Sequence, residues 1–197
     1  MRILILTHER SGGFSLTNWI GNELNVDIYH EPFNSPTIDS NVFGNSNCVV
    51  KIFPKFPITL GINFFDFINS FDRVILHKRK NKLDASISLA YLKNNINFGY
   101  HNTYEIDEKW IEDNQLLINT ELSNIENFDK EIENILLKTY IETTYEGVFE
   151  TKEDINKIVK FLDFKNEPKW LDWLDNKRRL RGGKLGINGV KIKKELI

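Results

Sequence analysis

The sequence contains little cysteine, little net charge and no long apolar run. Its one cysteine, Cys48, excludes an intrachain disulfide and a cysteine-rich metal site. The 26 Lys and Arg against 28 Asp and Glu give a net charge of −2, which argues against nonspecific nucleic-acid binding. No segment reaches the ~20 apolar residues of a membrane helix, and the apolar start is interrupted at Thr7, too early for a signal peptide. We therefore expect a soluble cytoplasmic protein with no nucleic-acid partner and no membrane span.

Arginine is also scarce. The chain has seven arginines but 23 asparagines and 24 isoleucines, a profile typical of an AT-rich genome. Five of the seven arginines fall in three short segments, residues 8–19, 76–89 and 177–186. Each segment has features of an anion site for a separate reason, so these segments are the first place to look for function.

Apolar periodicity predicts strands alternating with helices. Short β-branched apolar runs predict strands over 2–7, 26–30, 48–53, 73–78 and 138–144. Helical spacing is found over 15–24, from Pro57 to Phe71, after Lys82, over 107–137 and in the last third of the chain. This alternation predicts one α/β domain over residues 1–197, with a largely parallel central sheet flanked by helices. In such sheets, ligands bind at the carboxyl ends of the strands.

The first arginine segment, HERSGGFSLTNW, lies between a predicted strand and a predicted helix. Its backbone N–H groups, the positive end of the helix and the Arg10 guanidinium could converge on one phosphate or sulfate. The G-x-x-x-x-G-K-S/T pattern of a nucleotide-triphosphate loop is absent, as is G-x-G-x-x-G. The structural alternative is a tight turn with an exposed arginine. The candidate residues are Arg10, Ser11, Gly12, Gly13, Phe14 and Ser15, the last also a candidate N-cap.

The other two segments are also rich in cations. LHKRKNKLDASISL places Arg79 and Lys80 after a predicted strand and Ser88 in the following helix, which suits a second dianion, although a solvated basic turn is the alternative. KRRLRGGKLG, at residues 177–186, joins five arginine and lysine side chains to a glycine pair. By itself it could also be a nucleic-acid patch or a disordered tail.

Taken together and in this order, the three segments resemble the cofactor-binding elements of the PAPS-dependent sulfotransferases, especially the short bacterial and viral type. ERSGGFSL is similar to the P-loop-like loop after strand 1 that holds the 5′-phosphosulfate, with Phe14 in place of a threonine. RKNKLDASIS matches the motif that holds the 3′-phosphate, which implies Arg79 and Ser88 for that role, with Lys80 as the competing cation. The resemblance extends over residues 2–190.

Two later segments extend the resemblance. TTYEGVFETKEDINKIVKFLDF is similar to the family's late Y-E-x-L and the helix after it. RGGKLG resembles the C-terminal loop that lies over the 3′-phosphate, which implies that Arg181, Gly182 and Gly183 bind the cofactor and that a tail of about residues 181–197 closes over it.

The catalytic base follows from a separate comparison. In the eukaryotic cytosolic branch the base is a histidine two residues after a strand-end lysine, but here the lysine is Lys51 and that position holds Phe53. In the bacterial branch it is a glutamate after strand 2, which implies Glu31 in YHEPF. His30 is the competitor, because the reference pKa of histidine is nearer neutrality. The structural alternative is that Glu31 caps a turn before Pro32.

The resemblance implies sulfonyl transfer from PAPS to a hydroxyl or amine, with release of 3′-phosphoadenosine 5′-phosphate (PAP). Glu31 would take the acceptor's proton, while Arg10 and Lys51 neutralise charge on the transferred group without a metal. The acceptor is an unidentified small molecule, carbohydrate or lipid headgroup, and the oligomeric state is open. The alternatives are a P-loop-like kinase and an inactive nucleotide- or polyanion-binding protein, the latter kept open by Phe14 at the threonine position.

Overall fold

The computed structural model describes residues 1–33, 41–53, 61–94, 104–133, 140–165, 170 and 190–192. Five strands form a parallel sheet in the order β2-β3-β1-β4-β6. These strands are β1 (Arg2–Thr7), β2 (Asp27–His30), β3 (Cys48–Ile52), β4 (Arg73–Lys78) and β6 (Tyr140–Thr144). The prediction of an α/β fold with a largely parallel sheet is confirmed.

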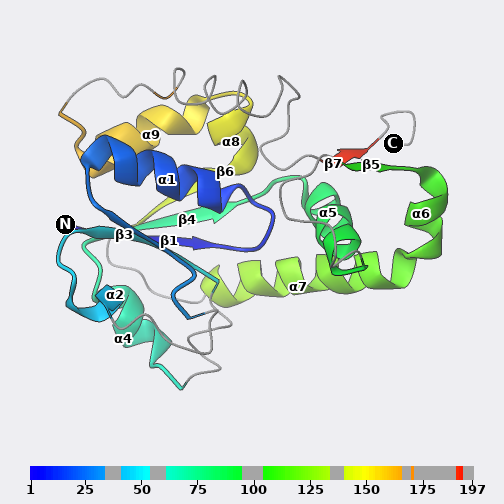
Figure 1. Ribbon diagram of the computed structural model, residues 1–197, viewed down its shortest axis with the longest axis horizontal. Coiled ribbons are helices and arrows are strands. Elements are labelled where there is room, and N and C mark those ends of the chain that lie inside the picture. Colours follow the sequence, from blue (N-terminus) through cyan, green and yellow to red (C-terminus); the bar gives the residue numbers. More distant parts are fainter. Residues whose placement is uncertain are drawn as a thin grey trace.

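Helices cover both faces of this sheet (Figure 1). α1 (Gly13–Leu24), α8 (Tyr145–Phe149) and α9 (Glu153–Leu162) lie on one face, and α2 (Asn41–Gly44), α4 (Phe64–Asn69) and α7 (Gln115–Glu133) lie on the other. α5 (Lys82–Asn94), α6 (Glu108–Asp113) and the small pair β5 (Tyr104–Ile106) and β7 (Val190–Ile192) lie beyond the carboxyl ends of the strands. Among the described residues, no helix is both long and apolar enough to cross a membrane.

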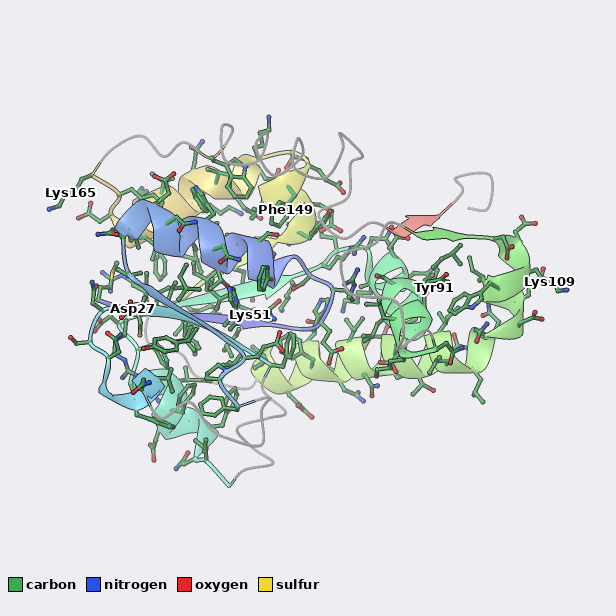
Figure 2. The ribbon with its side chains drawn as sticks, in the orientation of Figure 1. Asp27, Lys51, Tyr91, Lys109, Phe149 and Lys165 are labelled. Atoms are coloured by element: carbon green, nitrogen blue, oxygen red, sulfur yellow. The ribbon has the colours of Figure 1, made fainter. Side chains whose placement is uncertain are left out.

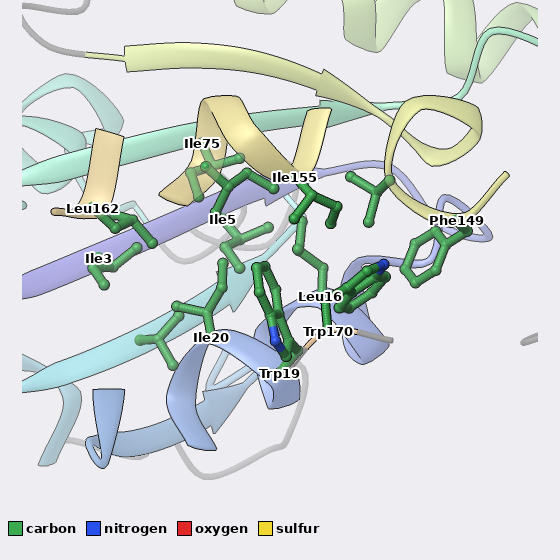
Figure 3. Close-up of a cluster of buried hydrophobic side chains, with 13 residues drawn as sticks. Ile3, Ile5, Leu16, Trp19, Ile20, Ile75, Phe149, Ile155, Leu162 and Trp170 are labelled. Carbon is green, nitrogen blue, oxygen red and sulfur yellow. The ribbon is translucent and has the colours of Figure 1, made fainter. Parts of the chain in front are cut away.

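Because side chains alternate in direction along each strand, the sheet has a separate apolar cluster on each face. Ile3 and Ile5 of β1 point to the α1 face, where they pack with Trp19 and Trp170 in the cluster shown in Figure 3. The two indole rings meet edge to face with centroids 4.7 Å apart. Leu4 and Leu6 point to the opposite face, which α4 and the end of α7 cover. Each fully buried Ile or Leu contributes about 1.5 to 3 kcal/mol to stability.

α1 approaches the sheet closely because of one glycine. A Cβ on Gly21 would lie 2.3 Å from Cγ1 of Ile28 on β2, so no larger residue fits there without displacement. The close approach sets the first turns of α1 beside the end of β2. The carboxyl ends of β2, β3, β1, β4 and β6 lie along one edge of the sheet, where the predicted site residues meet.

Candidate functional site at the carboxyl edge of the sheet

The loop from β1 to α1, residues 8–12, forms the first part of the site. Gly12 has φ of +85°, and a side chain there would come within 2.7 Å of the Phe149 ring. A Cβ on Gly13 would lie 2.8 Å from Cγ2 of Thr7. Both glycines are therefore required by the path of the chain, Gly12 also by its left-handed backbone.

The loop leads directly into the N-terminus of α1. The N–H groups of Ser15 and Leu16 bond to the carbonyl of Gly12 at 3.0 and 3.2 Å, so Gly12 is the N-cap and Ser15 lies buried in the first turn. The prediction that Ser15 is the N-cap is wrong. The first turn has no acidic residue, and no described side chain caps it. The positive end of the helix thus points into the loop.

A buried hydrogen-bond network fixes the loop after β1 to β4 and β6. Oγ1 of Thr7 donates to the carbonyl of His77 on β4 at 2.8 Å, and Oγ of Ser11 donates to the carbonyl of His8 at 2.9 Å. Nε2–H of His77 donates to the carbonyl of Ser11 at 2.9 Å, and its Nδ1 accepts from Oγ1 of Thr143 on β6 at 2.9 Å. Burial lowers the pKa of His77 to about 4, so the ring is neutral at pH 7.

Arg10 connects the loop to the second predicted segment. It has φ of +62°, and its Nε donates to Oγ of buried Ser88 on α5 at 2.8 Å. Nη1 of Arg79 donates to the carbonyl of Arg10 at 3.1 Å. The Arg79 guanidinium also lies 4.7 Å from the centre of the Tyr145 ring and 3.8 Å from the Asp84 carboxylate. The structure therefore brings Arg10, Arg79 and Ser88 together.

The Lys80 side chain is placed differently. It is 61% exposed, and its Nζ lies 3.4 Å from the carboxylate of Glu153 at the start of α9. Arg79, by contrast, is mostly buried beside the loop. Of the two competing cations, Arg79 is the one in contact with Arg10.

Glu146, the second residue of α8, is a site residue that sequence reasoning did not assign. Its carboxylate accepts the backbone N–H groups of Lys80 and Asn81 at 2.9 and 3.0 Å, just before α5 begins. Burial alone would raise the pKa of Glu146, but these hydrogen bonds and the nearby Arg79 charge outweigh it and lower the pKa. The Y-E pair of the late motif was the available signal, but its partner lies 65 residues earlier.

Three further predicted residues meet at the ends of β2 and β3. His30 pairs in register with Lys51, and the N–H of Glu31 donates to the carbonyl of Lys51 at 2.8 Å. Nζ of Lys51 forms an ion pair with the Glu31 carboxylate and lies 3.9 Å from the centre of the Phe53 ring. Burial lowers the pKa of Lys51, and the Glu31 charge opposes this shift. Figure 2 shows Lys51 near the carboxyl edge of the sheet.

His30 packs against the start of α1. Its ring stacks on that of Phe14, with centroids 4.1 Å apart and an interplanar angle of 24°. Its Nε2 lies 3.2 Å from Oδ1 of Asn18. Phe14 is half exposed, so it forms part of the rim of the candidate site.

His8 and Asp129 are further buried polar residues that the sequence analysis did not assign to the site. Nδ1–H of His8 donates to the carbonyl of Glu9 at 2.7 Å, and burial lowers its pKa. Asp129 of α7 lies 2.5 Å from Nζ of Lys82. Within the described ranges, no three or more metal-ligating side chains are grouped.

The third predicted segment lies outside the described residues. This applies to Arg181, Gly182 and Gly183 and to the tail expected to close over the cofactor. Their predicted role remains a proposal.

Comparison with known proteins agrees with this architecture. No protein-family model matches the sequence, and no curated protein matches it. Among solved structures, the fold is similar to that of mouse sulfotransferase SULT7A1 complexed with PAP, with a TM-score of 0.56 and 15% sequence identity. The match covers 97% of this chain and 69% of the mouse chain. The chain therefore has the fold of the sulfotransferases.

Proposed function

We propose that this protein transfers a sulfonyl group from PAPS to a hydroxyl or amine and releases PAP. The observation that carries the proposal is the junction of Arg10, Arg79 and Ser88, where the loop after β1 meets the start of α5. Two elements that the sequence predicts to bind anions are thereby adjacent at one edge of the sheet. A donor with a 5′-phosphosulfate and a 3′-phosphate has the two anionic groups that such a pair would bind.

In this proposal the loop after β1 holds the 5′-phosphosulfate. Its N–H groups and Arg10 bind the anion, and Lys51 neutralises charge that develops during transfer. Ser11, Gly12, Gly13, Phe14 and Ser15 form the loop and the first turn of α1. Arg79 and Ser88 bind the 3′-phosphate, with Arg181, Gly182 and Gly183 closing over it.

The reaction is an in-line displacement at sulfur. The acceptor oxygen forms a bond to the sulfonyl sulfur, the bond from sulfur to the 5′-phosphate oxygen breaks, and PAP leaves with that electron pair. A base beside the loop takes the acceptor's proton, and the two candidates are Glu31 and His30. We further propose a small-molecule, carbohydrate or lipid-headgroup acceptor, a cytoplasmic location, and the short bacterial and viral type of the family, which ERSGGFSL supports.

Thermal unfolding with nucleotides tests the proposal. A ligand at a hundred times its Kd stabilises the native state by about 2.7 kcal/mol. We expect PAP to raise the Tm far more than AMP or ATP at equal concentration. Equal shifts with PAP and AMP would show that no 3′-phosphate site exists.

A second measurement separates an enzyme from a binding protein. Sulfonyl transfer from labelled PAPS is screened against hydroxyl and amine acceptors. PAP binding without transfer to any acceptor would support the alternative of an inactive binding protein, because Phe14 provides no hydroxyl at the loop.

A further inference from the structure

His30 is held by an amide whose orientation is fixed. Nδ2–H of Asn18 donates to the carbonyl of Phe14 at 2.9 Å, one turn earlier on α1. Oδ1 of Asn18 therefore faces Nε2 of His30, at 3.2 Å. Since an amide oxygen only accepts, Nε2 of His30 must carry the hydrogen.

The other ring nitrogen, Nδ1, then carries no hydrogen and has a free lone pair for accepting a proton. Nδ1 of His30 is buried and has no hydrogen-bond partner in the part of the chain that the structure describes. A buried acceptor without a donor is unfavourable, and such groups in native structures commonly have a functional reason. His30 lies at the carboxyl end of β2, and its ring stacks on Phe14 in the first turn of α1.

Two packing features hold this arrangement. The Phe14 ring lies flat on the imidazole, and Gly21 allows α1 to lie close enough to β2 for the short Asn18 side chain to reach His30. Neither feature would be needed for a histidine that only points into solvent.

Burial and the Lys51 charge keep the His30 ring neutral at pH 7. Burial, followed by the Lys51 charge, lowers the pKa of His30 to about 4, and the Glu31 carboxylate opposes this. The residues of α1 that contact the ring, Phe14 and Asn18, do not titrate. The Glu31 carboxylate is itself in the ion pair with Lys51.

We propose that His30 is the base of the sulfonyl transfer and that Asn18 is its positioning residue, while Glu31 serves to hold Lys51. This inference rests on the proposed function. Nδ1 of His30 takes the proton of the acceptor hydroxyl as its oxygen attacks the sulfonyl sulfur, and the 5′-phosphate leaves with the electrons of the broken bond. The imidazolium that forms keeps its Nε2–H bond to Asn18 and lies beside the Glu31 carboxylate.

The tautomer is measured without turnover. In protein labelled with ¹⁵N-histidine, two-bond proton–nitrogen correlations identify which ring nitrogen carries hydrogen, and a His30→Gln sample assigns the signals. We expect Nε2–H in the wild type, a mixture of tautomers in Asn18→Leu, and Nε2–H again in Asn18→Asp, which keeps an acceptor. The control is Asn22→Leu, an exposed position on the same helix. Nδ1–H in the wild type, or no change in Asn18→Leu, would overturn the inference.

Kinetics then test the role of the lone pair. His30→Gln should lower kcat by about 10² to 10⁴, the usual value of a general base. Asn18→Leu should lower kcat about tenfold to a hundredfold, because the residue that orients the imidazole is lost. The affinity for PAP should not change. Full turnover in His30→Gln would return the role to Glu31. Absence of PAP binding in the wild type would instead refute the proposed function, and with it the transfer role of His30, whatever tautomer is found.

Discussion

Non-glycine residues with a left-handed backbone occur at both ends of the five-stranded sheet, and they differ in kind between the two ends. At the amino end they are Asn25 and Asp163, which end α1 and α9 with φ of 51° and 54°. Asn and Asp tolerate this conformation. At the carboxyl end they are Arg10 and Glu31, with φ of 62° and 50°. The fifth such non-glycine residue in the described part of the chain, Lys152, precedes α9 and is exposed.

Buried polar groups divide in the same way. At the amino end, hydrogen bonds such as that from the Met1 ammonium to the Ser46 carbonyl are exposed and join loops. At the carboxyl end, Lys51, His77 and Ser88 are each less than 5% exposed. Backbone strain of about 1 to 2 kcal/mol per residue and buried polar groups are thus concentrated where the proposed anion sites would lie. The comparison with the amino end indicates that the fold itself does not require this strain or these buried polar groups.

The largest expected effect is the loss of stability in acid. His77 has a pKa of about 4 in the folded chain and about 6.5 when unfolded, so the unfolded state takes up a proton that the folded state does not. This gap corresponds to about 3 kcal/mol, fully present above pH 6.5 and lost as the pH falls to about 4. Urea unfolding across this range should show the decline, and His77→Gln should make it less steep, the remainder coming from His30 and His8, whose pKa values burial also lowers. An equally steep decline in that variant would assign the effect to other groups.

Lys51→Met should destabilise the chain by about 2 to 3 kcal/mol. It removes the ion pair from the Glu31 carboxylate. Because Glu31 is 24% exposed, the cost lies near or below the lower end of the range for buried pairs. The control at the amino end is Asp27→Ala, whose exposed carboxylate accepts from Asn45 and should cost less than about 1 kcal/mol. Urea unfolding measures both, and equal losses would remove the contrast between the two ends.

Arg79→Ala should weaken PAP binding by about 1.5 to 3 kcal/mol and hardly change AMP binding, because it removes a charge-assisted bond to one phosphate. Lys80→Ala, on the neighbouring exposed side chain, should change neither. Calorimetric titration gives both affinities. A selective loss of PAP affinity in Lys80→Ala would mean that Lys80, and not Arg79, is the cation that binds the 3′-phosphate.

Gly21→Ala should cost about 1 to 2 kcal/mol, since the added Cβ would lie 2.3 Å from Ile28. Gly44→Ala is the matched control, because nothing lies within 4 Å of a Cβ there. Thermal unfolding compares the two. A neutral Gly21→Ala would show that Ile28 moves aside easily.

The smallest effect should come from Asn25→Gly. Both residues adopt the left-handed conformation, so we expect a change within about 0.5 kcal/mol, whereas Asn25→Ala should cost about 1 kcal/mol. Equilibrium unfolding of the pair measures the strain at an ordinary helix end. A large gain from glycine would mean that strain is not confined to the site.

The sheet could be predicted from the sequence because buried strands need continuous apolar runs. β1 and β4 have the predicted bounds, and β2 and β3 differ by one residue at one end. The helix predicted from Pro57 to Phe71 was wrong over residues 61–63 and 70–71, because the Asn63 side chain accepts the Asp66 N–H and α4 extends only from Phe64 to Asn69. Residues 57–60 lie outside the described part of the chain. The pairing of β5 with β7 joins short segments more than 80 residues apart, which no local pattern indicates.

The candidate site was predictable where one loop forms it. Residues 10–15 follow directly from the strand, glycine and helix pattern. The links between loops were not predictable: Glu146 binds backbone N–H groups before α5, and Asn18 reaches His30 because Gly21 permits it. These contacts depend on the spacing between packed elements, which only the folded chain defines.

The hydrogen bonds beneath the loop have a consequence for protein engineering. His77 and Thr143 belong to two other strands, yet they fix the carbonyl at Ser11. Grafting residues 8–19 onto another parallel sheet would transfer the glycines and the arginine but not the hydrogen bonds from β4 and β6 that fix the loop. A working transplant would have to include the β4 histidine and its β6 threonine, so the smallest portable unit is three adjacent strands and one helix.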